Sequence, residues 1–243
     1  MKNIKLTLSY AGTNYHGFQR QKNAITIQEK VEQALQTVFG ESIPLTAAGR
    51  TDAGVHAVGQ VVNFKVATSI PINRIPYALN ANLPHDIVVT AAEFVPDDFH
   101  ARYCAKSKVY RYTIDNAEHP RVFTRHYALH IGYPLNLTLM QQAAATLVGK
   151  HNFRSFMASG SSVQTTERHL LRLDVQKQQQ YIEITVEADG FLYNMIRIIT
   201  GTLIEVGRGK RPPDLTPVLN ERSRAAAGWT APPHGLVMLE VKY

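Results

Sequence analysis

Cysteine and long apolar runs are what this sequence lacks most clearly. Cys104 is the single cysteine among 243 residues, so the chain cannot close an internal disulfide, which fits a reducing compartment. From its usual burial habits we expect Cys104 to be a small buried hydrophobe. The longest apolar runs fall far short of the ~20 residues that a membrane-spanning helix needs, and the opening MKNIKLTLSY lacks the apolar region of a signal peptide. We therefore expect a globular, cytoplasmic protein with no membrane segment.

Motifs for metals and nucleotide cofactors are also missing. The ten histidines and one cysteine show no HExxH, paired-cysteine or clustered-histidine spacing. The sequence contains neither a GxxxxGK[ST] loop nor a GxGxxG turn after a strand-like segment. We therefore expect no metal site and no small-molecule cofactor.

Acidic residues are fewer than basic ones, with 19 Asp and Glu against 26 Lys and Arg, which gives a net charge of +7 and a pI of about 9.5. Such a charge favours a polyanionic partner, because fixed cations release counterions condensed on phosphates. Charge alone does not establish this partner, since many basic proteins bind no nucleic acid. The cations are scattered along the chain, so any basic patch must be built by the fold.

The first half of the sequence reads in the order β-α-β-β-α-β. Residues 3–10 alternate apolar and polar side chains, which predicts a half-buried strand. Thr26 and Glu29 have the spacing of a capping box, and the helical apolar spacing that follows ends at Gly40. Further strands are predicted over 43–48, 59–67 and 87–95, and a short helix over 73–80.

The second half repeats this order. Its predicted elements are a strand over 108–114, a helix over 138–149, a hairpin over 169–176 and 181–188, a long helix over 191–206 and a closing strand over 235–243, and the polar stretch 157–167 predicts a loop. Two such units predict an α+β fold of two ferredoxin-like halves with mainly antiparallel sheets, spanning residues 1–103 and 104–243. An edge-to-edge junction of the two sheets, around a central basic cleft, would fit this order.

The stretch AAGRTDAGVHAVG, residues 47–59, concentrates ionisable groups among small residues on a predicted loop. Glycines at 49 and 54 permit positive φ and close approach of a substrate to Asp52. Asp52 could instead serve only as an Asx turn that accepts backbone amides. Glycoside hydrolysis normally needs two flanking carboxylates, and no second acid is near in the sequence. What remains is chemistry that one carboxylate performs on a polyanionic substrate.

Five segments carry a resemblance to a known family: GRTDAGVHA at 49–57, YHGFQRQ at 15–21, NANLP with DDFHAR within 80–102, KVYRYTI at 108–114 and MIRIITGTLIEVGRGK at 195–210. In this order they resemble the tRNA pseudouridine synthase A family over nearly the whole chain. The resemblance implies a cofactor-independent, homodimeric isomerase that converts uridine to pseudouridine in the anticodon stem-loop of tRNA, at positions 38 to 40. It also implies two ferredoxin-like halves around a basic cleft.

The resemblance makes Asp52 the catalytic carboxylate. It would act as a nucleophile on the sugar or base, or as the base that removes a ribose proton, and the sequence does not choose between these roles. Because the target uridine is normally stacked, the enzyme must also extrude it. Arg50, two residues before the acid, would fill the gap or hold the flipped phosphate; otherwise it is a surface arginine.

Tyr110 and Arg197 complete the implied catalytic set. Tyr110 shares a strand face with Lys108 and Tyr112, and the family pattern makes it the tyrosine that stacks on the uracil, whereas a core role suits Tyr112 better. Helical periodicity from residue 191 places Arg197 away from the main apolar stripe and so predicts that it is exposed. Other isoleucines extend the apolar surface around that helix, so a covered Arg197 would need a carboxylate partner, and the family pattern supplies Asp52.

The remaining candidates carry weaker signals. Asn194, with Tyr193, is close enough to Arg197 to line the cleft, and for His56 a structural hydrogen bond is the safer interpretation. Substrate contacts with phosphates are expected among the cations, namely Arg20, Lys22, Lys108, Arg111, Arg154 and Arg168. Two other functions stay open. One is a non-catalytic basic RNA-binding module with RRM-like halves, although KVYRYTID lacks the glycine and paired aromatics of an RNP1 segment. The other is a small-molecule lyase or glycosidase that releases free uracil.

Overall fold

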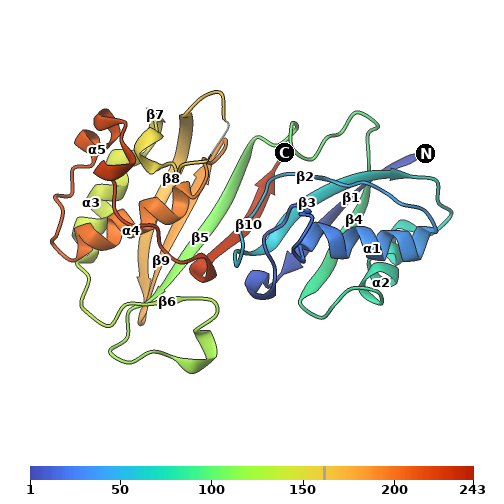
Figure 1. Ribbon diagram of the computed structural model, residues 1–243, viewed down its shortest axis with the longest axis horizontal. Helices are drawn as coiled ribbons and strands as arrows, with labels where there is room; N and C mark the ends of the chain where they lie inside the picture. Colours follow the sequence, from blue (N-terminus) through green and yellow to red (C-terminus); the bar gives the residue numbers. More distant parts are fainter. Residues whose placement is uncertain (161–162) are drawn as a thin grey trace. The chain divides into compact units, whose positions relative to one another are not determined.

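The computed structural model describes residues 1–160 and 163–243, so residues 161 and 162 of the predicted 157–167 loop lie outside the described residues. The chain forms two compact units (Figure 1). One comprises Met1–Lys106 together with Val237–Tyr243, and the other comprises Ser107–Leu236. This grouping differs from the predicted division at 103 and 104 chiefly at the closing strand, because that strand pairs in parallel with a strand of the first unit.

The first unit has the predicted β-α-β-β-α-β order. Its elements are β1 (Lys2–Tyr10), α1 (Ile27–Phe39), β2 (Thr46–Ala47), β3 (His56–Val66), α2 (Ile75–Asn80) and β4 (Ile87–Val95), with β10 (Leu236–Lys242) added at the end of the chain. β1 pairs antiparallel with both β3 and β4, and β2 pairs antiparallel with β3. The resulting order β4-β1-β3-β2 is that of a ferredoxin-like sheet. Alternate residues of β1, Ile4, Leu6 and Leu8, are fully buried, as the sequence pattern predicts.

Helix α1 begins and ends where its local signals predict. The Thr26 hydroxyl accepts a hydrogen bond from the backbone N–H of Glu29, at 3.4 Å. Gly40 closes the helix in the left-handed region, with φ of 78°, and its N–H donates to the carbonyl of Gln36.

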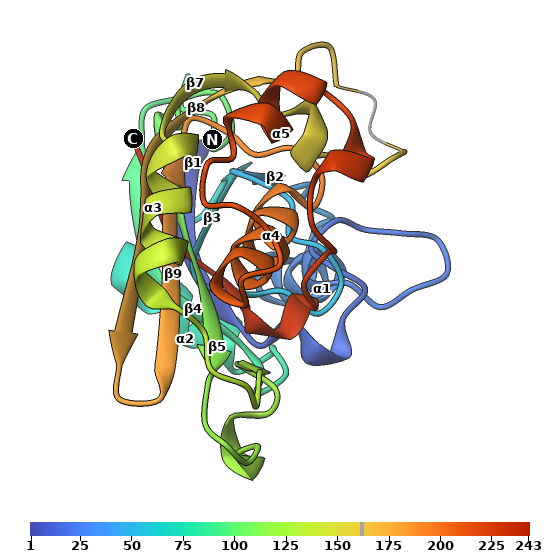
Figure 2. The same cartoon turned by 90° about the vertical axis from the view of Figure 1, so that its left-hand side faces the viewer.

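The second unit is also α+β. Its elements are β5 (Ser107–Asp115), β6 (Leu129–His130), α3 (Leu137–Leu147), β7 (Gly149–Asn152), β8 (Glu167–Gln178), β9 (Tyr181–Ala188), α4 (Met195–Gly207) and α5 (Thr216–Glu221). The strands β5, β9, β8 and β7 pair in this order and are all antiparallel, and β6 adds to β5 in parallel. Helix α3 packs against β8 and α4 (Figure 2). The predicted α+β class with mainly antiparallel sheets is confirmed.

Three local expectations need correction. Cys104 is exposed, because it lies in the connection after β4 rather than on a strand or helix with a buried face. Strand β2 spans only Thr46–Ala47 instead of 43–48. Helix α4 starts at Met195 instead of 191, because Asn194 before it adopts a left-handed backbone with φ of 59°. Over the described residues, the structure contains no helix with the length and apolarity that crossing a membrane requires.

Candidate active site

Asp52 lies on the loop between β2 and β3, which is bonded to β3 before Asp52 and closed by a turn after it. Before the loop, the Ala48 N–H donates to the Val61 carbonyl at 2.8 Å, and the Gln60 side-chain amide donates to the Gly49 carbonyl at 2.8 Å. After Asp52 the chain turns, with the Val55 N–H donating to the Asp52 carbonyl at 3.1 Å. The carboxylate is thus carried by a defined turn at the edge of a buried strand.

A second motif segment, YHGFQRQ at residues 15–21, forms backbone hydrogen bonds with the Asp52 loop. The Phe18 N–H donates to the Thr51 carbonyl at 3.0 Å, and the Gly54 N–H donates to the Tyr15 carbonyl at 3.3 Å. Gly17 has φ of 90°, and a Cβ there would lie 2.7 Å from the Thr51 carbonyl oxygen. Only glycine fits this approach, so the two segments form one structure around the acid.

Thr51 anchors the loop from inside the first unit. Its hydroxyl lies 2.8 Å from the hydroxyl of Tyr10, and both side chains are buried. Burial raises the pKa of Tyr10 to about 12, so its phenol stays neutral and hydrogen-bonded near neutral pH. Sequence reasoning missed this pair, since the two residues are 41 positions apart and neither carries a local signal.

Arg50, Asp52 and His56 have different environments. Arg50 is exposed and Asp52 is partly exposed, whereas His56 is 4% exposed. The Nδ1 of His56 accepts a hydrogen bond from the Gly12 N–H at 3.0 Å, a structural hydrogen bond of the kind expected for this histidine. Gly12 packs so tightly that a Cβ would meet the Val55 carbonyl oxygen at 2.0 Å. His56 therefore ties the start of β3 to the segment after β1.

Tyr110 and Tyr112 lie on β5 in the second unit. Tyr110 is 7% exposed, and its ring packs edge-on against Phe191 with centroids 5.2 Å apart. Tyr112 is fully buried, and its hydroxyl donates to the Pro232 carbonyl at 2.8 Å, so its predicted core role is confirmed. Burial raises the pKa of Tyr112, while the positive charge of Arg197 opposes that rise. Arg197 is thus close enough to Tyr112 to act on it electrostatically.

Arg197 is partly buried rather than exposed, because α4 is covered nearly all round: Ile198 and Ile204 are as buried as the main apolar stripe. Its guanidinium is held at two nitrogens. Nε donates to the Ala231 carbonyl at 2.7 Å, and Nη1 donates to the Asn194 side-chain oxygen at 2.7 Å. The expected proximity of Asn194 and Arg197 is confirmed, and the two contacts fix the direction in which the guanidinium points.

The other candidate cations differ in their exposure and in whether they form ion pairs with carboxylates. Arg20 is exposed and pairs with two carboxylates of α1, Glu32 at 3.1 Å and Glu29 at 4.0 Å. Lys108 is partly buried on β5 opposite Ala188. Arg111 pairs with a glutamate of β9, Lys22 and Arg154 are exposed, and Arg168 is only partly exposed. The candidate residues are divided between the units, with Asp52, Arg50 and Arg20 in the first and Tyr110, Lys108, Asn194 and Arg197 in the second.

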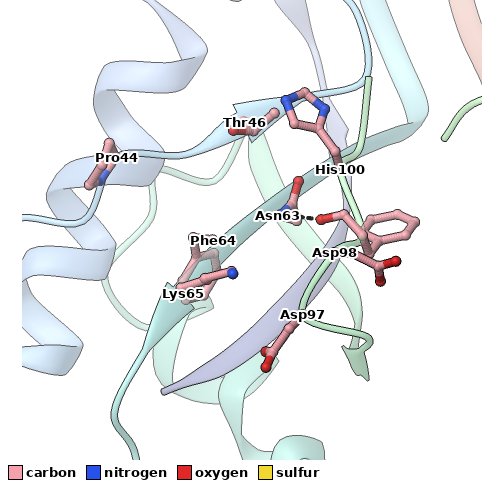
Figure 3. A pocket seen from close by; sticks show the side chains of 9 residues that line it. Pro44, Thr46, Asn63, Phe64, Lys65, Asp97, Asp98 and His100 are labelled. Atoms are coloured by element: carbon pink, nitrogen blue, oxygen red, sulfur yellow. Dashed lines mark hydrogen bonds between the residues drawn. The ribbon is translucent and has the colours of Figure 1, made fainter. Parts of the chain in front are cut away.

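A hollow of the first unit lies apart from these residues. It is lined by β2, β3 and the segment after β4, with Asp97, Asp98, His100 and Lys65 around it (Figure 3). In its wall the Asn63 side-chain amide donates to the Phe99 carbonyl at 3.2 Å. Within residues 1–160 and 163–243, no three or more His, Cys, Asp or Glu side chains are grouped as metal ligands would be.

Comparison with known proteins agrees with the resemblance carried by the motifs. A family model described as tRNA pseudouridine synthase matches residues 7–104 and 143–243. The chain is 49% identical over 244 residues to tRNA pseudouridine synthase A of Thermoanaerobacter sp. (strain X514), covering 100% of both chains. It is 50% identical to that of Moorella thermoacetica, covering 99% of both, and 46% identical to that of Bacillus subtilis (strain 168), covering 99% of this chain and 98% of the relative. Because the family model spans most of the chain and these relatives match it from end to end, the chain belongs to the tRNA pseudouridine synthase family.

Proposed function

We propose that this isomerase of tRNA uridine acts in the anticodon stem-loop, at positions 38 to 40, with Asp52 as its catalytic carboxylate and without a cofactor. Membership of the tRNA pseudouridine synthase family over the length of the chain carries this proposal. The Asp52 loop supports it, because hydrogen bonds from two sides hold a partly exposed carboxylate at the end of a strand.

The reaction needs no oxidant, reductant or energy source, because substrate and product are isomers. The N1–C1′ bond of uridine breaks, the uracil turns, C5 bonds to C1′, C5 loses its proton, and N1 gains one. Asp52 acts either by forming a covalent bond to the nucleoside or by removing a ribose proton. In both cases it must be ionised when the reaction starts.

We propose that Arg197 keeps Asp52 ionised and oriented, and that Tyr110 stacks on the turning uracil. The family pattern supports the role of Arg197, whose guanidinium is held within its own unit by Asn194 and the Ala231 carbonyl. Tyr110 is supported by its place on β5, where Phe191 fixes the ring. The exposed Arg50 occupies the gap left by the flipped nucleotide or holds its phosphate.

The test is release of tritium from tRNA labelled at C5 of uridine, together with mapping of the pseudouridine formed. We expect purified protein to release tritium in EDTA without any added small molecule. Asp52→Asn keeps the shape of the side chain but is a very poor nucleophile or base, so turnover should fall by several orders of magnitude while tRNA binding persists. Asp97→Asn, an exposed carboxylate of the same unit, is the matched control and should keep wild-type turnover.

Three outcomes would contradict the proposal. Binding of tRNA without tritium release would favour the RRM-like module, and free uracil as product would favour a glycosidase. Asp52→Asn with more than about a tenth of wild-type turnover, only ~1.4 kcal/mol in barrier height, would remove the carboxylate from the chemistry.

We further propose that the enzyme is a homodimer and works in the cytoplasm. The family resemblance supports the dimer, and the single cysteine fits a reducing compartment. Sedimentation of the purified protein measures the oligomeric state directly, and a monomer at assay concentration would contradict the dimer.

A further inference from the structure

The connection between β5 and α3, residues 116–136, displays an apolar side chain that folding does not explain. Phe123 is 96% exposed, and its neighbours Val122 and Tyr127 are 65% and 53% exposed. Figures 1 and 2 both show this connection as a green loop projecting beyond the end of β5. It lies between the two parts of the chain that the family model matches. Exposed apolar side chains that occur together, unlike single ones, are typical of surfaces that contact another molecule.

The connection is ordered, so the exposure of Phe123 is not the result of a frayed segment. At its base, β6 pairs with β5, and the Asn116 side-chain amide donates to the carbonyls of Ile131 and Tyr133, each at 2.8 Å. At its tip, the Thr124 carbonyl accepts the N–H groups of Tyr127 at 2.8 Å and of Ala128 at 3.0 Å. Several hydrogen bonds therefore hold the backbone of the connection that carries Phe123.

Within four residues on either side of Phe123 in the sequence, every side chain is cationic or neutral. The basic-aromatic segment, residues 119–127 with the sequence HPRVFTRHY, contains two arginines and two histidines and no carboxylate. Arg121 already has partners within the unit: its Nε lies 4.0 Å from the Asp115 carboxylate, and its Cζ lies 4.9 Å from the centroid of the Tyr181 ring. Arg125 is exposed, and its Nε contacts the neighbouring His126. An exposed ring beside an exposed arginine suits a partner with flat apolar faces and negative charges.

Single-stranded nucleic acid has both properties, since every base has a face that stacks on an aromatic ring and every nucleotide has a phosphate. A second copy of the chain fits less well. A twofold contact of this segment with itself would bring like charges together, and three exposed side chains are few for the ~800 Å² that each partner of a standard interface buries.

We propose that the basic-aromatic segment is an additional RNA contact, in which Phe123 stacks on an unpaired base of the tRNA and Arg125 binds an adjacent phosphate. The choice of RNA as the partner rests on the proposed function. The contact positions tRNA and takes no part in the chemistry, so its loss affects tRNA affinity and KM but leaves kcat unchanged.

Binding measurements on five variants test the contact. We expect Phe123→Ala and Phe123→Leu to weaken tRNA binding about fivefold or more, because base stacking is lost with the ring even where apolar area remains. Phe123→Trp should keep or tighten binding. Tyr77→Ala removes an exposed aromatic side chain of α2, outside the segment, and is the matched control, with wild-type affinity expected. Arg125→Gln should weaken binding and reduce the slope of log K against log salt by about one.

Fluorescence of Phe123→Trp tests the stack directly. The chain has one natural tryptophan, Trp229, so the wild-type protein gives the baseline. Addition of tRNA should quench the new tryptophan beyond that baseline. Tyr77→Trp, at a residue 72% exposed on α2, controls for quenching without stacking.

Two results would overturn the inference. One is wild-type tRNA affinity and KM in Phe123→Ala. The other is an altered monomer–dimer equilibrium in Phe123→Ala with unchanged tRNA affinity, which would make the segment a contact between copies. Failure of the proposed function is separate, because the wild-type protein would then release no tritium, whereas the effect of Phe123 on RNA binding is measured without turnover.

Discussion

At the scale of single residues, Arg197 gives the sharpest test of the proposed chemistry. Arg197→Lys keeps the positive charge but loses the planar fork that now reaches Asn194 and the Ala231 carbonyl. If the guanidinium orients Asp52, turnover should fall at least tenfold in a tritium-release assay, with a modest loss of thermal stability. Arg211→Lys is the matched control, because Arg211 also bridges a side chain and a backbone carbonyl in the same unit, Glu205 and Ala226. It should lose similar stability and keep its turnover; equal turnover in both variants would reduce Arg197 to a structural role.

At the scale of elements, the support of the Asp52 loop by Gly17 is open to test. Gly17→Ala forces a side chain into a left-handed backbone and against the Thr51 carbonyl, so the loop must shift. Gly40→Ala meets the same backbone cost, of about 1–2 kcal/mol, but a Cβ there has open space around it. Both variants should melt at lower temperature, and only Gly17→Ala should lose turnover at saturating tRNA. Wild-type turnover in folded Gly17→Ala would mean that the loop geometry does not set the activity.

The same scale shows which features of the fold can be predicted from sequence. The ends of α1 were predictable because capping acts within four residues, at Thr26 and Gly40. The start of α4 was not, because apolar residues continue before it and only the left-handed Asn194 interrupts the helix. In the site, the motif places Asp52 on its loop, but its supports, Gly17 and the buried Tyr10, come from distant sequence. Local rules carry no information about such long-range contacts.

At the scale of the whole molecule, the excess of cations should determine how tRNA binds. The 26 lysines and arginines exceed the 19 acidic residues and give a net charge of +7. Several of these cations, such as Arg20 and Arg211, form ion pairs within the fold. Other cations can neutralise phosphates of the tRNA. Each phosphate neutralised makes the slope of log K for tRNA binding against log salt concentration steeper by about 0.7–0.9. Binding of tRNA should therefore weaken by orders of magnitude between low and physiological salt.

This salt dependence should be confined to binding. Rotation of the uracil and bond formation occur after the tRNA is docked, so kcat at saturating tRNA should change little with salt while KM rises steeply. Free uridine, which has no phosphate to neutralise, should not react at any salt concentration. The measurement is tritium release across a salt series at several tRNA concentrations, with the melting temperature of the tRNA followed in parallel to exclude its unfolding. A KM that stays flat as salt rises, or efficient conversion of the nucleoside, would show that the basic surface is incidental to substrate recognition.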